Sequence, residues 1–157
     1  MNKSTYLIYE TGSDYDRWQK LVFIAIPSVF FVIGLVMLLE NTTDAAALFA
    51  IAILEALLFH SIAPRKFQLF EDRLRVVLGK PFAFSISLAT IKNVQPASGV
   101  KSHIYWGVRW ATSSHNVVEI VRRKGWNMVI SPSNREIFLE QVNDAVKAYQ
   151  QSSSSSG

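Results

Sequence analysis

Two titratable side chains interrupt an otherwise apolar stretch of the sequence. From Ala45 to Ala63, nineteen residues contain Glu55 as the single acid and His60 as the other titratable group. A carboxylate inside a bilayer is costly, so such a group usually faces a protein partner or a cavity. On a helix Glu55 shares a face with Ala52 and Ala56, which favours helix packing, with an ion or proton relay as the alternative. His60 lies about 140° further around the helix, away from the i,i+4 position of a relay partner, and is expected near the headgroups.

Basic side chains form a second group with chemical potential. Thirteen basic and six acidic residues follow Ala63, which gives this part of the chain a net charge of +7. Positive side chains beside a bilayer attract its anionic headgroups without a specific ligand. The residues predicted to form this anionic-lipid surface are Arg65, Lys66, Arg73, Arg75, Arg122, Arg123 and Lys124.

Other chemistry has little support in the sequence. There is no cysteine, and no Gly-rich phosphate loop, nucleophile elbow or paired acid and base is found. His103 and His115 lack the spacing of metal ligands, so no metal or other cofactor is predicted. Tryptophans and arginines between residues 106 and 126 occur without a nucleic-acid-binding signature, and attraction to a membrane explains the charge more simply. We therefore predict a non-enzymatic protein that does not bind nucleic acid.

The elements that position these groups begin with two membrane spans. Residues 21–39 and 45–63 are each nineteen residues long, close to the length of helix that crosses a hydrocarbon layer. Residues 1–20 are a polar segment with a short β-prone run, Tyr6 to Tyr9. Basic residues flank the two spans on their outer sides and are absent from the short loop between them, so the positive-inside rule predicts a two-pass protein with both termini in the cytoplasm.

After Pro64 the periodicity changes from helical to alternating. Segments around residues 67–78, 82–95, 105–111, 117–122 and 126–130 predict about seven short strands. Ser133 and Glu136 form a capping box that opens a helix. The apolar stripe of this helix is Phe138, Val142, Ala145, Val146 and Tyr149. We therefore assign residues 64–151 to one domain and the serine-rich residues 152–157 to a disordered tail.

Two stretches carry a resemblance to a known family. One is Val118-Glu119-Ile120 followed by residues 125–132, which end in Ile-Ser-Pro, and by the Phe-Leu pair of residues 136–139. The other comprises Leu74 to Gly79 and Ile86 to Val94. With the preceding spans, these stretches resemble bacterial membrane proteins that carry a pleckstrin-homology-like domain. The resemblance implies an α+β membrane protein, with a helical hairpin followed by antiparallel strands in two near-orthogonal sheets closed by a C-terminal helix.

The resemblance leaves several functions open, because this fold hosts lipid, peptide and protein binding. Lys66, Arg73 and Arg75 match the spacing with which some pleckstrin-homology domains hold inositol phosphates, but two arginines on one strand face are equally typical of a solvated edge. We predict a bacterial inner-membrane scaffold whose cytoplasmic domain binds a protein partner or a second copy of the chain. The alternatives are a ligand- or lipid-responsive regulator and a small transporter or channel subunit that uses Glu55.

Overall fold

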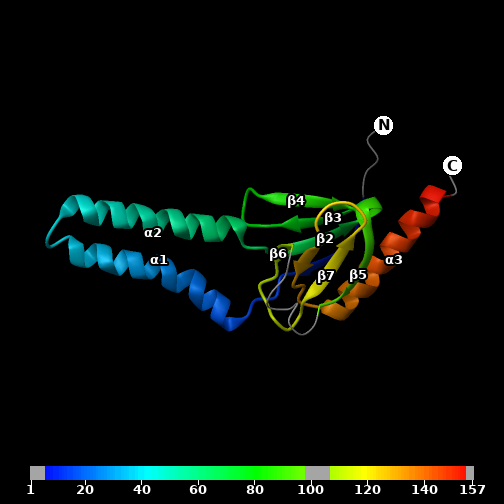
Figure 1. The fold of residues 1–157 in the computed structure, drawn as a ribbon, viewed down its shortest axis with the longest axis horizontal. Helices are drawn as coiled ribbons and strands as arrows, with labels where there is room; N and C mark the ends of the chain where they lie inside the picture. The colour runs from blue at the N-terminus through cyan, green and yellow to red at the C-terminus, as the bar shows by residue number, and fades with distance from the viewer. Residues whose placement is uncertain (1–5, 98–106, 155–157) are drawn as a thin grey trace.

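The computed structural model describes residues 6–97 and 107–154. A long helical hairpin projects from one end of a strand-rich domain, which is covered by the C-terminal helix α3 (Figure 1). The α+β class and the order of the parts, with two long apolar helices before the strands and one helix after them, confirm the prediction.

The hairpin consists of α1, Arg17–Met37, and α2, Thr42–Ile62. Each has 21 residues and an apolar composition that permits a membrane span. Helix α2 begins earlier than the predicted span because the side chain of Asn41 accepts a hydrogen bond from Thr43 N at 2.9 Å and caps it. The helices pack closely where Gly34 leaves room for the ring of Phe49, since a Cβ at Gly34 would lie 2.8 Å from that ring.

The first sheet has the order β1-β2-β3-β4. Its strands are β1, Leu7–Gly12; β2, Lys66–Phe70; β3, Arg73–Val77; and β4, Ala83–Ser87. All neighbours are antiparallel, and Gly12 at the end of β1 is paired with Lys66 at the start of β2. The sheet therefore takes its edge strand from residues that the sequence analysis assigned to a separate N-terminal segment. The whole helical hairpin is inserted between two paired strands.

The second sheet has the order β5-β7-β8-β6. Its strands are β5, Ile91–Pro96; β6, Val108–Trp110; β7, Val118–Arg122; and β8, Met128–Ile130, with the short helix η1, Leu88–Thr90, before β5. The predicted strand over residues 105–111 corresponds to β6, although residues 105 and 106 lie outside the described part. β6 pairs with β8 in parallel, unlike the predicted antiparallel arrangement, because the chain crosses from β5 on one edge to the opposite edge. β8 starts later than predicted, so Trp126 lies in the turn and is 73% exposed.

Helix α3, Arg135–Ser154, closes the domain core. Phe138 and Val142 are fully buried, and the ring of Phe138 meets that of Phe67 edge-on at 6.0 Å. The predicted stripe is thus confirmed. The predicted helix start is wrong by one residue: Phe138 N donates to the carbonyl of Asn134, which makes Asn134 and not Ser133 the capping residue. The helix continues to Ser154, into the segment that the sequence analysis assigned to a disordered tail.

Candidate functional site

A short linker, residues 13–16, joins β1 to α1 and is fixed to the domain by backbone hydrogen bonds. Ser13 N donates to Arg65 O at 2.9 Å, which ties the outgoing chain to the returning chain. Asp14 N donates to Ser131 O and Asp16 N to Thr112 O, both at 2.8 Å. The start of the hairpin is therefore bound to both sheets and not only to the strand that precedes it.

The carboxylate of Asp16 reinforces this connection. It does not cap α1, and instead accepts hydrogen bonds from Ser114 N and Ser114 Oγ, both at 2.8 Å, and from Ser113 Oγ at 3.1 Å. Partial burial raises the pKa of Asp16, but the hydrogen bonds from Ser114 and Ser113, with the nearby His115, outweigh burial and hold the pKa below its ordinary value. The ionised form of Asp16 thus stabilises the junction.

We expect this junction to weaken in acid. Because the folded pKa of Asp16 lies below the unfolded one, its contribution is present above the unfolded pKa, near pH 4, and is lost as the pH falls through the folded pKa. Asp16→Asn should lower the melting temperature of the detergent-solubilised protein at pH 7, and the difference from the parent should shrink as the pH falls below about 4. Ser114→Ala removes one donor and should give a smaller difference with the same trend. Melting curves of parent and Asp16→Asn that stay separated by a constant amount at all pH values would contradict this role.

Beside the linker, the ends of α1 and α2 enclose a groove of about 500 Å³. Tyr15 lines the domain-side end of this groove, and its hydroxyl donates to Pro64 O at 2.5 Å. Burial raises the pKa of Tyr15, opposed by the nearby charge of Arg65. Arg65 Nη2 lies 3.0 Å from Nδ1 of His60, and the position of His60 near the headgroups stays a prediction. The part of the groove between the two helices is apolar and includes Phe23 and Phe59, whose rings stack with their centres 5.2 Å apart.

The turn between β3 and β4 also lies against the hairpin. Gly79 is buried on the end of α2, where a Cβ would come within 1.7 Å of His60 O. The turn is held by Leu78 N to Phe82 O at 3.0 Å and Phe82 N to Gly79 O at 2.9 Å. Lys80 and Phe82 remain exposed next to the end of the span. The hairpin is therefore held by the domain on both sides, at residues 13–16 and at this turn.

Glu55 lies on the partly buried stripe of α2. Its Oε2 atom is buried, yet it has no hydrogen-bond partner within the described residues. Ala52 and Ala56, on the same face of α2, line an apolar groove of about 430 Å³ with Pro27 and Phe31 of α1. The other polar group there, the hydroxyl of Ser28, donates to Ile24 O of its own helix at 2.8 Å. Ala52 and Ala56 thus open onto an apolar groove, and a role of Glu55 in helix packing stays a prediction.

The structure divides the predicted anionic-lipid residues between two ends of the domain. Arg65 and Lys66 lie at the hairpin end, where Lys66 Nζ is 3.1 Å from Glu10 Oε1. At the other end, backbone hydrogen bonds join neighbouring turns: Leu88 N donates to Asp72 O, and Arg123 N donates to Thr90 O.

Arg73 and the turn formed by Arg122, Arg123 and Lys124 therefore lie at the end of the sheets far from the hairpin. Arg73 contacts Asp72 at 3.6 Å, and Arg75 is exposed midway along β3. The prediction that the Arg122–Lys124 turn joins Arg65 and Lys66 in one membrane-facing surface is wrong in this respect. The reason is strand direction: β2 leads away from the hairpin, and β7 ends at the far side.

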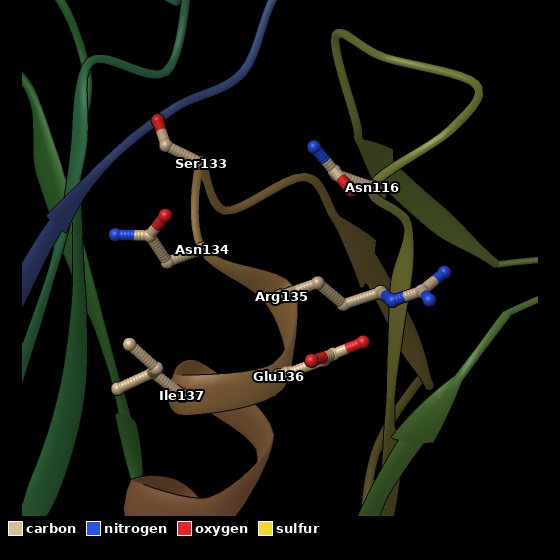
Figure 2. A pocket seen from close by; sticks show the side chains of 6 residues that line it. All are labelled: Asn116, Ser133, Asn134, Arg135, Glu136 and Ile137. Carbon is tan, nitrogen blue, oxygen red and sulfur yellow. The ribbon is translucent and has the colours of Figure 1, made fainter.

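A second, polar groove of about 270 Å³ lies where α3 begins. Figure 2 shows Arg135 and Glu136 pointing from the helix toward the segment that carries Asn116, with Ser133, Asn134 and Ile137 on the other side. Arg135 Nη1 donates to His115 O at 3.3 Å. Ile137 is 49% exposed, an apolar side chain at the rim of a polar groove.

Several junction residues escaped the sequence interpretation. Lys20 was used only for topology, yet its Nζ lies 6.0 Å from the centre of the Tyr15 ring. Asp14 and Asp16 before the first span, and the Thr-Ser-Ser run at residues 112–114, were visible as polar clusters. Their pairing spans about a hundred residues of chain and has no periodic signal in the sequence.

Comparisons with known proteins bear on the domain and not on the junction. No curated protein and no solved structure matches the chain. The family model described as a bacterial PH domain matches residues 65–146, from the start of β2 to the last buried turn of α3. This match covers more than half of the 157 residues, and the chain therefore belongs to the bacterial PH domain family.

Proposed function

We propose that this protein is a non-enzymatic membrane anchor that holds a bacterial PH domain in a fixed orientation at the cytoplasmic surface of the inner membrane. In that position the domain presents a docking surface to a protein partner or to a second copy of the chain. Domains of this family are typical interaction modules, which supports a binding role over a catalytic one.

The observation that carries the proposal is the insertion of the helical hairpin between two paired strands. A domain attached by one flexible linker could rotate freely above the bilayer. Here the chain leaves the sheet at Gly12 and returns at Lys66, its pairing partner. The polar junction at residues 13–16 and the buried turn at Gly79 add contacts on both sides. Such a connection is suited to presenting one face of the domain at a constant height and angle.

The proposed orientation rests on charge. Arg17 and Lys20 lie in the first turn of α1, and Arg65 and Lys66 follow α2, whereas the connection between the helices contains no Lys or Arg. Basic residues favour the cytoplasmic side. The side that carries the domain and both chain ends is therefore the cytoplasmic one in this proposal.

We place the docking surface at the groove where α3 begins. It combines an exposed apolar side chain, Ile137, with charged and amide groups of Arg135, Glu136 and Asn116. Protein interfaces commonly combine apolar and polar contacts. The alternative of transport through the hairpin is supported by Glu55 alone, and its neighbours Ala52 and Ala56 favour packing.

The test is purification of the full chain in mild detergent, with native mass spectrometry to read the mass of the complex. The parent should carry a stoichiometric protein partner or a second copy. Ile137→Asp should lose it, whereas Trp126→Asp, at another exposed apolar residue, should retain it. A parent that is monomeric and without a protein partner at all detergent and protein concentrations would overturn the proposal.

A further inference from the structure

We propose that the groove between the domain-side ends of α1 and α2 binds one anionic phospholipid from the adjacent leaflet. The phosphate would lie between Lys20 and Arg65, and one acyl chain would follow the apolar floor. This site is formed by the hairpin helices and the segments that join them to the domain, and it shares no lining residue with the groove proposed above for a protein partner.

Two cations lie near the domain-side end of the groove: Arg65 is one of its lining residues, and Lys20 lies close to Tyr15, which also lines it. Both Lys20 and Arg65 are exposed, and both are positioned around Tyr15. Lys20 Nζ lies 6.0 Å from the centre of the Tyr15 ring, and the charge of Arg65 acts on the Tyr15 hydroxyl. Arg65 Nη2 lies 3.0 Å from both ring nitrogens of His60, and the Tyr15 hydroxyl donates to Pro64 O at 2.5 Å. Within the described residues, no carboxylate lines this groove to compete for the two cations.

The shape of the groove matches an amphipathic ligand. It extends along α2 from Ala63 to Ala56, about 10 Å of helix rise, and so from the level of the headgroups into the hydrocarbon. Small side chains at both alanines leave the space open, while the stacked rings of Phe23 and Phe59 form an apolar wall. A volume of about 500 Å³ accommodates a glycerol phosphate group with the first part of an acyl chain.

A phospholipid fits these observations better than a soluble anion. A free phosphate would use the cations but would leave the apolar wall exposed to water. A neutral lipid would use the wall but not the cations. Basic pockets between membrane helices bind anionic headgroups by this combination of charge and apolar contact.

The experiment is a lipid titration of the full chain in mild detergent, read by native mass spectrometry. The probes are phosphatidylglycerol and, as a neutral comparison, phosphatidylcholine. We expect one phosphatidylglycerol to bind at least about tenfold more tightly than phosphatidylcholine, since each basic residue near a membrane surface contributes about fivefold. The double variant Lys20→Ala, Arg65→Ala should weaken phosphatidylglycerol binding by about twentyfold.

The matched control is the double variant Arg73→Ala, Arg123→Ala, which removes the same charge at the far end of the domain. It should leave lipid binding unchanged, and an equal loss in both double variants would overturn the site in favour of general attraction. Ala56→Leu keeps the charge but fills the groove, so it should weaken binding more than Ala46→Leu, a change at an exposed alanine of the same helix. The assignment would be overturned if these two leucine variants bind phosphatidylglycerol equally well, or if the parent binds the two lipids equally well. Displacement of phosphatidylglycerol by millimolar inorganic phosphate would also overturn it.

Discussion

Replacing Phe138 by alanine is expected to lower the free energy of unfolding of the domain by about 3 to 5 kcal/mol. Phe138 is fully buried between α3 and the sheets, and its ring packs edge-on against Phe67. Truncation removes its apolar contacts and leaves a cavity that the two sheets cannot fill without moving. The measurement is denaturant unfolding of the detergent-solubilised full chain, followed by a signal from the domain.

Two changes on the same helix serve as controls. Ile137→Ala removes a neighbouring apolar side chain that is 49% exposed, and Lys147→Ala removes one partner of an exposed ion pair with Asp144 at 3.5 Å. Each should cost less than about 1 kcal/mol. A similar, small effect of all three changes would mean that α3 does not pack on the core.

The closing helix illustrates what could be predicted from the sequence. Phe138, Val142 and Val146 recur at helical spacing, and the structure buries all three. In the same way, alternation around Leu74 and Val76 predicted a strand with one buried face, which β3 has. These features depend on local periodicity, because one face of an element must turn toward the core.

The first strand illustrates what could not be predicted. Tyr6 to Tyr9 has β propensity, but its partner β2 follows only after the whole helical hairpin. Nothing local to β1 identifies that partner, and Leu7 and Ile8 stay half exposed at the sheet edge, so the burial pattern is weak. The pairing depends on the chain returning to its starting point, which is a property of the whole fold.

The candidate site was predictable only in its residue types. The basic residues near the spans predicted contact with anionic lipid, and Arg65 is one of the residues that line the groove. The grouping was wrong for Arg122, Arg123 and Lys124, because strand direction carries them to the far end. Lys20 lies near the groove, close to the Tyr15 ring, a neighbour relation that charge counting does not reveal.

Replacing Gly79 by alanine is expected to detach the β3–β4 turn from the hairpin. A Cβ at this position would lie 1.7 Å from His60 O, 2.6 Å from His60 C and 2.9 Å from Ser61 Cα. All three atoms belong to the backbone of α2, so no side-chain rotation can relieve the clash. We expect a destabilisation of about 2 kcal/mol or more, as for overpacked cores, together with a change in the position of the domain relative to the spans.

Because the chain has no cysteine, this change in position can be measured with two nitroxide labels, at Phe82→Cys in the turn and Ile62→Cys at the end of α2. In the parent the distance between the labels should be short and narrowly distributed, and in Gly79→Ala it should be longer and broader. Gly12→Ala is the matched control, because its Cβ would meet the mobile end of a side chain, Ser133 Oγ, at 3.3 Å. If Gly79→Ala leaves the distance distribution as narrow as Gly12→Ala does, the turn does not hold the domain to the hairpin. The fixed orientation would then depend on the polar junction at residues 13–16 and on the pairing of β1 with β2.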